Sequence, residues 1–301
     1  MVFNGEGIRR YESSLLQISS RAIPRSTPSV ARNLLVKERE SDYFYFIDDD
    51  TYLSDDFIGK VCEIIRNYPE VEIFGGPDTC SADVTLAERS LELALRSPLT
   101  TSKTRKRHIP DKKSDLKPGH EKNLILCNLC VKGSVFTLHN TFFPEDYQRN
   151  EENVFLRSLQ DKVKIGYFPH LYIFHERRPS LKNVFYAAST SGFYRFQMIK
   201  ANPVFDQFIF FIPSFFLLYL SFCLIFYPLI GMTFSFYIPL LTYLILNLLT
   251  SLRIACQAKH LACFPLVMFY QFFIIMSYGI GFISGERRGL KDPEPIRESV
   301  T

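Results

Sequence analysis

Two long apolar runs constrain this chain of 301 residues more than any other feature. No Asp, Glu, Lys or Arg occurs from Gln207 to Leu252, and a second uncharged run extends from Leu261 to Gly285. A helix needs about 20 apolar residues to cross a bilayer, so the first run can hold two spans with a turn near Pro228–Gly231. A buried helix pair of a soluble core would not need this length. The sequence therefore predicts a transmembrane region over residues 205–285, with two to three spans, and a C-terminal tail over 286–301.

The flanking residues bear on where this membrane protein resides. The start of the chain, MVFNGEGIRRYESS, has no apolar h-region, so no signal peptide is expected. Seven cysteines, several of them in or beside the apolar runs, suit reduced thiols on the cytoplasmic side better than disulfides. A cytoplasmic soluble domain would place the loop with Arg253 and Lys259 inside, as the positive-inside rule requires. We expect a multi-pass protein of the inner or plasma membrane with its soluble domain in the cytoplasm. A third full span would place ERRGLK outside, so the last run could instead be re-entrant or interfacial.

Residues 1–200 predict a soluble α/β domain. Tyr43–Ile47 is a short continuous apolar run, typical of a strand that is covered on both faces. The following LSDDFIGKVCEIIRNYPE predicts a helix capped by Ser54, with Ile58 and Val61 on its apolar face. VEIFGGP predicts a second strand, and TLAERSLELALRS a second helix. This alternation predicts a mostly parallel sheet, in which ligands bind beyond the carboxyl ends of the strands.

Three consecutive aspartates, Asp48, Asp49 and Asp50, directly follow the first predicted strand. Neighbouring carboxylates repel each other by roughly 1 kcal/mol per close pair even in water, so a positive group is expected beside them. Mg2+ or Mn2+ would suit, because these ions take carboxylate oxygens and share their other positions with phosphates. An EF-hand calcium loop does not fit, because Tyr52 and Leu53 stand where a ligand and a glycine are needed. A solvated acidic turn is the alternative.

A second acidic cluster lies within FFPEDYQRNEENVFLRSLQD, residues 142–161, just before or at the start of a predicted helix. It contains Glu145, Asp146, Glu151 and Glu152. Acidic residues in a first helical turn often only compensate the helix dipole. In a domain that holds a metal–phosphate site, a carboxylate here could instead act as the general base that takes a proton from an attacking hydroxyl.

Basic residues form two further groups. His175, Arg177 and Arg178 follow the apolar run Leu171–Phe174 and could lie at a strand end. Guanidinium groups bind diphosphates well, because their donors are planar and permanently charged; a basic patch against lipid headgroups is the alternative. The segment 103–122 predicts a basic loop, either merely solvated or attracted to anionic headgroups or a phosphate-bearing substrate. Since no recognition motif accompanies the charge, no nucleic-acid partner is expected.

Taken in order, these segments resemble the family 2 glycosyltransferases, whose membrane-attached members build bacterial polysaccharides and glycolipids. The resemblance covers about residues 1–200 and is carried by PSVARN, FIDDD, IFGGP, LCNLCVKGS, NEENVFLRSL and HERRPSLKNVFYAASTSGFYR. SYGIGFISG is similar to the membrane tail of the succinoglycan-type subgroup. The resemblance implies a GT-A (Rossmann-like) fold and inverting transfer from a nucleotide-diphosphate sugar to a glycan or lipid-linked acceptor. It also implies that transfer takes place at the cytoplasmic membrane face, beside membrane lipids, with Mg2+ or Mn2+ as cofactor.

The resemblance also assigns roles to particular residues. FIDDD is similar to the family's DxD motif, which maps Asp48 and Asp50 onto the metal ligands. NEENVFLRSL resembles the ED motif, and its second acidic position gives Glu152 as the catalytic base with Glu151 beside it. Together with the basic residues described above, the nucleotide-sugar-binding residues that we expect are Asp48, Asp49, Asp50, His175, Arg177 and Arg178.

One part of the family pattern is missing. Its members normally open with a strand–helix–strand unit that holds the nucleotide base and includes a VIPTYN-like strand. VFNGEG, with Asn4, resembles only the end of that unit's second strand, so we expect an N-terminally truncated catalytic domain. The alternative function is therefore a truncated, non-catalytic membrane pseudoenzyme that serves as an interaction or assembly partner. A transporter is disfavoured, because no charged residue lies inside the spans.

Overall fold

The computed structural model describes residues 26–287 except 112, 204 and 231–233. The predicted VFNGEG feature with Asn4 lies outside the described residues. The chain divides into two compact units, each built from separate stretches of sequence. Among the described residues the first unit contains 26–76 and 113–173, and the second contains 77–111 and 174–287. The division thus differs from the predicted single boundary near residue 200.

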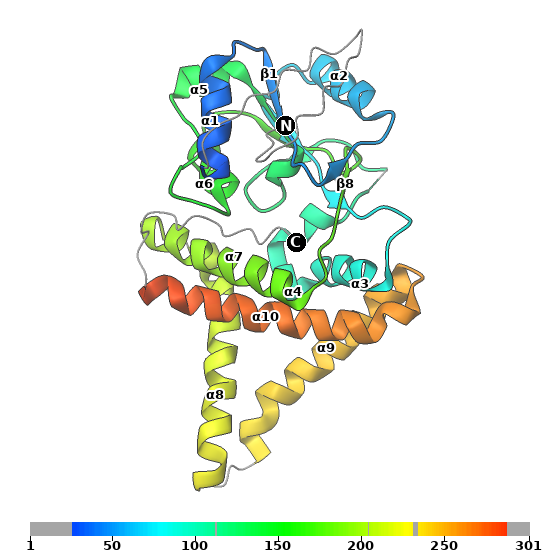
Figure 1. Cartoon of the computed structure of the whole chain (residues 1–301), viewed down its shortest axis with the longest axis vertical. Coiled ribbons are helices and arrows are strands. Elements are labelled where there is room, and N and C mark those ends of the chain that lie inside the picture. The colour runs from blue at the N-terminus through cyan, green and yellow to red at the C-terminus, as the bar shows by residue number, and fades with distance from the viewer. Residues whose placement is uncertain (1–25, 112, 204, 231–233, 288–301) are drawn as a thin grey trace. The chain divides into compact units, whose positions relative to one another are not determined.

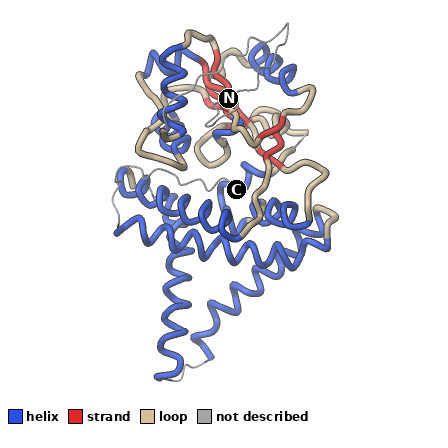
Figure 2. Tube along the Cα trace, in the orientation of Figure 1, coloured by secondary structure: helices blue, strands red, loops and turns tan. Residues whose placement is uncertain are grey.

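A five-stranded sheet forms the centre of the first unit, with the strand order β1-β6-β3-β7-β5. Its strands appear in red in Figure 2. Their bounds are β1 Tyr43–Phe46, β3 Ile73–Gly75, β5 Lys117–Pro118, β6 Leu129–Lys132 and β7 Ile165–Tyr167. The predicted α/β class and the two predicted strands are confirmed.

The sheet is mixed rather than mostly parallel, which corrects the prediction. β3 and β7 are parallel, whereas β6 is antiparallel to both β1 and β3, and β5 is antiparallel to β7. Because β6 lies between them, β1 and β3 still run in the same direction. The sequence showed strands alternating with helices, but it did not show that a strand from residues 129–132 would insert between the first two.

The carboxyl ends of β1, β3 and β7 lie at one edge of this sheet. The register pairs both Phe46 and Gly75 with Leu129, and Gly75 with Tyr167. The chain therefore leaves the last residue of each of these strands at the same edge, where β6 begins. Asp48, two residues beyond Phe46, lies at this edge, as the sequence predicted.

Helices cover both faces of the sheet (Figure 1). α1 (Pro28–Glu38), α5 (Gly133–His139) and α6 (Glu151–Leu159) pack on one face, and α2 (Phe57–Asn67) packs on the other. Side chains of a strand alternate between the faces, so within β3 Ile73 joins the first apolar core and Phe74 joins the second. The short elements β2 (Thr51–Tyr52) and η2 (Leu126–Asn128) also belong to this unit.

Helix α2 differs in detail from its prediction. Asp56 is its N-cap residue, and the Ser54 hydroxyl donates a hydrogen bond to the Asp56 carboxylate at 2.6 Å instead of capping the helix. Phe57 and Val61 are buried, but Ile58 is 62% exposed. The buried stripe begins at Phe57 because its ring packs edge-on against Tyr45 of β1.

The second unit is mainly helical, and it contains β4 and residues 174–175 of the neighbouring strand β8. Its first described elements are β4 Asp78–Thr79, α3 Leu86–Leu95, α4 Pro98–Thr101, η1 Ser102–His108 and β8 Ile173–His175. They are followed by α7 Leu181–Ala201, η3 Phe205–Phe211, α8 Ile212–Ile230, η4 Phe234–Tyr237, α9 Ile238–Gln257, η5 Leu261–Cys263 and α10 Phe264–Arg287. The predicted α3 is confirmed and begins with a capping box formed by Thr85 and Glu88. The predicted basic loop is wrong over 102–108, which form the 3-10 helix η1 with Arg107 buried.

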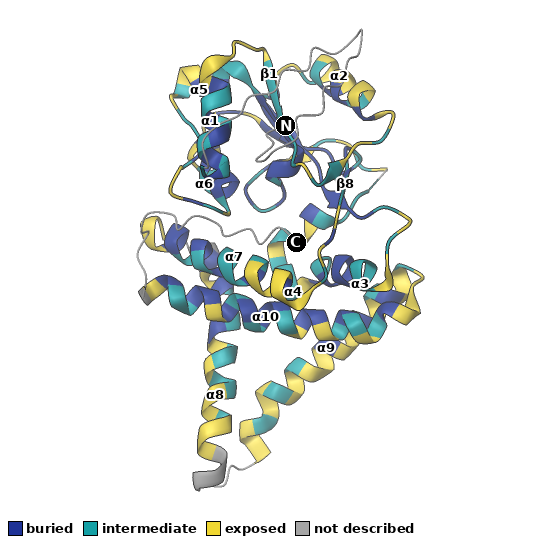
Figure 3. Cartoon of the chain, in the orientation of Figure 1, coloured by how far each residue is buried: buried dark blue, intermediate teal, exposed yellow. Residues whose placement is uncertain are grey.

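Three helical segments of this unit are long and apolar enough to cross a membrane, which matches the two to three predicted spans. They are Gln207–Phe226, Phe234–Gln257 and Leu261–Glu286. Their most apolar windows are 11%, 17% and 44% buried, respectively. Figure 3 shows the same difference, with α8 and α9 largely exposed and α10 covered along much of its length. The third segment is therefore distinct from the first two.

Helix α10 is covered because α7 runs alongside it within the second unit (Figure 1). Their backbones approach closely at two glycines. A Cβ at Gly281 would overlap the carbonyl oxygen of Ser189, and a Cβ at Gly192 would overlap that of Tyr278. Close contact through small residues is typical of helix pairs in membranes.

Hydrogen bonds also fix α10. The Gln271 amide donates to the Ser251 hydroxyl of α9 at 2.7 Å, and its carbonyl oxygen accepts from Ser97, before α4, at 2.9 Å. All three side chains are buried. Polar groups in an apolar helix bundle need such partners, so these bonds fix the position of α10 against α9 and against Ser97.

Candidate active site

The aspartate trio forms a tight turn at the carboxyl end of β1. The Asp48 carbonyl accepts hydrogen bonds from the Thr51 backbone N–H, at 3.3 Å, and from the Thr51 hydroxyl, at 2.6 Å. Asp49 is exposed, whereas Asp48 and Asp50 are half-buried. The turn therefore presents the three carboxylates differently, with Asp49 the most open to water.

The second acidic cluster lies at the start of α6. Asn150, in the left-handed region at φ 63°, is the N-cap residue, and Glu151 and Glu152 form the first turn of the helix. Both glutamates are buried, at 5% and 6% exposed. Phe155 on the next turn is packed in the core of the sheet, which fixes the helix and hence its first turn. Burial of two adjacent carboxylates exceeds what dipole compensation at a solvated helix end requires.

Arg32 joins the two acidic clusters. Its guanidinium Nη2 donates to Asp48 Oδ1 at 2.9 Å, and its Nη1 donates to Glu151 Oε1 at 2.9 Å. The Arg32 side chain is only 15% exposed, and that of Asp48 is 36% exposed. The structure thus brings together two predicted site residues that lie about a hundred positions apart in sequence.

Asn33, the next residue of α1, holds the loop that leads into α6. Its amide nitrogen donates to the Phe143 carbonyl at 2.8 Å and to Glu145 Oε1 at 3.0 Å, while its oxygen accepts from the Phe143 N–H at 3.0 Å. Asn33 is 2% exposed. The sequence analysis assigned no role to either Arg32 or Asn33. The segment PSVARN offered a sequence signal for them, because its last two residues, Arg32 and Asn33, are polar although a core residue would be expected at this point of the helix.

The surroundings of Glu151 change its acidity. Burial, and the neighbouring charge of Glu152, raise the pKa of Glu151 to about 7, against the lowering effect of Arg32. A carboxyl group with such a pKa exchanges its proton near neutral pH. This is the range in which a general base or a proton-linked switch works.

The donor set at the turn fits a hard divalent cation. Asp48 already accepts a cationic group at 2.9 Å and is partly open to solvent. Mg2+ and Mn2+ bind carboxylate oxygens and retain water or phosphate at their other positions. Asp48 and Asp50 are therefore residues that could hold such an ion, and their role as metal ligands stays a prediction.

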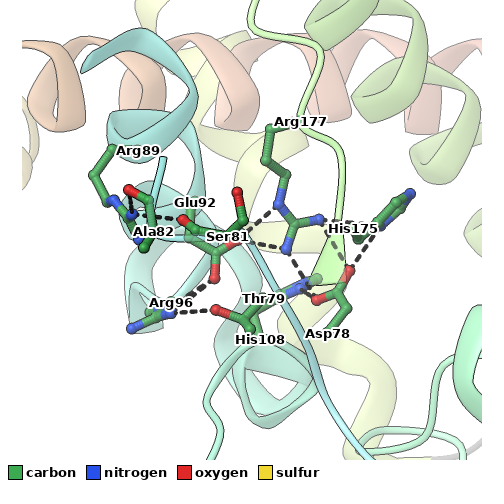
Figure 4. A network of polar contacts seen from close by, with 10 residues as sticks. All are labelled: Asp78, Thr79, Ser81, Ala82, Arg89, Glu92, Arg96, His108, His175 and Arg177. Carbon is green, nitrogen blue, oxygen red and sulfur yellow. Dashed lines mark hydrogen bonds and ion pairs between the residues drawn. The ribbon is translucent and has the colours of Figure 1, made fainter. Parts of the chain in front are cut away.

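The predicted basic residues His175 and Arg177 belong to the second unit, where they lie in a buried ionic network (Figure 4). Arg177 donates to both Asp78 oxygens, at 2.9 and 3.0 Å, and its Nε donates to Glu92 Oε2 at 2.6 Å. His175 Nδ1 lies 2.9 Å from Asp78 Oδ2. Asp78 and Glu92 are completely buried, so their charges depend on these partners. Arg178, by contrast, is exposed.

Two more basic residues complete this network. His108 Nδ1 lies 2.5 Å from Asp78 Oδ1, and Arg96 donates to Glu92 Oε1 at 2.9 Å. Burial opposes ionisation of Asp78, but Arg177 and His108 outweigh it and hold the pKa of Asp78 well below its usual range. The carboxylate is therefore ionised at all physiological pH values. The sequence did not indicate that Asp78 and Glu92 would hold Arg177.

Comparison with known proteins bears on the first part of the chain. Residues 8–122 match the family model described as Glycosyl transferase family 2. This segment is similar to the family 2 glycosyltransferases. The match includes α1 with Arg32 and the aspartate turn, so the predicted resemblance is confirmed over these residues. No curated protein matches the chain.

Solved structures show only a remote likeness to this chain. Three of them are S. aureus TarS 1-349 alone, in complex with UDP-GlcNAc and in complex with UDP. Each is 12% identical, with TM-scores of 0.37, 0.37 and 0.36. They cover 89%, 90% and 89% of this chain, and 74%, 75% and 74% of those chains.

Proposed function

We propose that the protein is an inverting glycosyltransferase that moves a sugar from a nucleotide-diphosphate sugar to a glycan or lipid-linked acceptor. The observation that carries the proposal is the contact of Arg32 with both Asp48 and Glu151, at 2.9 Å each. This contact links Asp48, a carboxylate of the kind that binds metal ions, to the buried Glu151. Asp48 lies at the sheet edge where α/β proteins bind ligands. The match of residues 8–122 to the glycosyl transferase family supports the same reaction.

In this proposal the two acidic clusters divide the work. Asp48 and Asp50 would hold Mg2+ or Mn2+, with Asp49 facing the nucleotide sugar. When bound, the cation supplies positive charge that offsets the charge of the departing diphosphate. Glu152 would take the proton from the acceptor hydroxyl, with Glu151 beside it. The buried first turn of α6 excludes water from these carboxylates.

The three basic residues would contribute differently to holding the leaving diphosphate. Arg178 is exposed and His175 is half-buried. Arg177 is 7% exposed, and Asp78 and Glu92 bind its guanidinium. We therefore assign Arg177 to holding this segment in place, and His175 and Arg178 to contact with phosphate.

We further propose that α8 and α9 cross the inner or plasma membrane and that the catalytic residues face the cytoplasm. The largely exposed apolar surfaces of both helices support this, since lipid would cover them. The greater burial of α10 favours an interfacial or re-entrant position for it. A lipid-linked acceptor could then reach the enzyme from the bilayer.

Two variants test the assignment of the base. Glu152→Gln should abolish sugar transfer while donor binding is largely retained, because only the proton acceptor is lost. Glu151→Gln should retain measurable transfer. Transfer from a panel of nucleotide sugars by membranes containing the full chain would be measured, with donor affinity measured by calorimetry. Unchanged turnover in Glu152→Gln would refute its role. If the wild-type protein neither binds nor consumes any donor of the panel, the pseudoenzyme alternative is correct.

A further inference from the structure

The guanidinium of Arg32 lies where the sequence required positive charge. Three adjacent aspartates predicted a cation at the end of β1, and the group found against Asp48 is Arg32, at 2.9 Å. The same guanidinium reaches Glu151 through its other terminal nitrogen, also at 2.9 Å. It thus offsets one negative charge in each acidic cluster.

The two contacts of Arg32 differ in their surroundings. Glu151 is 7% exposed at its side chain, so its bond to Arg32 is shielded from water. Asp48 is 36% exposed and lies at an exposed turn, so its bond to Arg32 competes with solvent. Of the two bonds, the one to Asp48 is therefore easier to break. Arg32 can remain anchored on Glu151 while its other nitrogen leaves Asp48.

We propose that Arg32 is a positioning residue that occupies Asp48 until a divalent cation binds there, and that the cation then displaces it. The inference rests on the proposed function, because it takes Asp48 as a metal ligand. A divalent cation at Asp48 and a guanidinium on the same carboxylate carry like charge and repel each other, so each lowers the affinity of the other. Arg32 keeps the unloaded site compact, and it weakens binding of a cation that arrives alone.

Binding of Mn2+ alone to the full chain in detergent tests the displacement, measured from the loss of the free-ion paramagnetic resonance signal. Arg32→Gln removes the competitor, so we expect Mn2+ to bind roughly fivefold more tightly or better than to wild type. Arg32→Lys retains a positive charge but lacks the second terminal nitrogen of the planar fork. It should also bind Mn2+ more tightly than wild type, and this gain cannot come from loss of charge. Arg66→Gln, on the exposed side of α2, is the matched control and should leave the affinity within about twofold of wild type.

Melting temperatures, measured with and without Mn2+, distinguish the displacement from a general effect of the substitutions on folding. Without metal, Arg32→Gln should lower the melting temperature, because buried Glu151 loses its partner. Mn2+ should then raise the melting temperature of this variant by more than it raises that of wild type. If wild type binds Mn2+ and neither Arg32 variant binds it more tightly, the displacement is refuted while the metal role of Asp48 stands. If no variant binds Mn2+ at all, the metal role in the proposed function and the displacement both fail.

Discussion

At the scale of single residues, the first turn of α6 places a carboxyl group with a pKa of about 7 inside the protein, that of Glu151. In the unfolded chain this group would titrate near 4.5. Between these two values the folded protein holds a proton that the unfolded chain has released. Raising the pH through this window therefore lowers the free energy of unfolding.

We expect Glu151→Gln to remove this pH dependence. Relative to wild type, the variant should gain stability between about pH 5 and about pH 8, because the amide never acquires the buried charge. Denaturant unfolding of both proteins at the two pH values would measure the difference. A constant difference across the window would show that Glu151 is already ionised throughout it.

The buried ionic network leads to a prediction for Arg177. Arg177→Leu leaves Asp78 and Glu92 with fewer partners in a site from which water is excluded. Removal of one member of a buried ion pair costs about 3–5 kcal/mol of stability. Arg178→Leu, at an exposed position, should change the unfolding free energy by no more than about 0.5 kcal/mol. Chemical unfolding in detergent would compare the two variants, and equal losses would exclude the supporting role of Arg177.

The sequence predicted some of these residues and could not predict others. Asp48 stood out because three consecutive aspartates follow an apolar run, and Glu151 because it lies in an acidic cluster at the start of a predicted helix. Arg32, Asp78 and Glu92 did not, because an isolated charged residue in a sequence does not reveal which distant residue it will meet. In each case the missing information was a tertiary contact.

At the scale of elements, the pairing of α7 with α10 depends on two glycines. In Gly281→Ala the new methyl group overlaps the carbonyl oxygen of Ser189, so the helices must separate. We expect a loss of about 1–3 kcal/mol, as for other overpacked interiors. Differential scanning of the purified protein would show it as a lower melting temperature.

Gly59→Ala is the matched control for this substitution. A Cβ at Gly59, in helix α2, meets nothing within 4 Å. Alanine also favours the helix by up to about 1 kcal/mol, so this variant should be as stable as wild type or more so. A similar loss in both variants would show that the α7–α10 contact is not the cause.

Elements were predicted better than their arrangement. The strand and helix of residues 43–67 follow from periodicity and charge, and so does α3 with its capping box. The segment LCNLCVKGS, which contains β6, was singled out only by the resemblance, and its place between β1 and β3 was not predicted, since strand order depends on long-range pairing. The burial of α10 was likewise not visible, because a uniformly apolar helix looks the same whether lipid or protein covers it.

At the scale of the whole molecule, the chain passes between its two units three times within the part that the structure describes. Residues 77–111 belong to the same unit as the apolar helices, and the core of that unit contains residues of both. Leu93 and Ala94 of α3 share it with Val267, Tyr270 and Ile274 of α10. A soluble domain ending near residue 200, as the sequence predicted, would leave this face of α3 uncovered.

Truncation after residue 203 should therefore do more than remove the three long apolar helical segments. We expect the fragment to aggregate or retain detergent, and residues 86–95 to exchange their amide hydrogens rapidly, because their apolar partners are gone. Hydrogen exchange by mass spectrometry on the fragment and the full chain would compare them. Full protection of residues 86–95 in the fragment would show that α3 folds without α10.

The shared core of α3 and α10 also affects how the protein is made. A ribosome makes α3 roughly 170 residues before α10, so over that interval the first of these helices has no lasting partner. The nascent chain must keep that apolar face from wrong associations until α10 has been made. Cells that lack a chaperone acting on such intermediates would accumulate little of this protein, whatever the stability of its finished form.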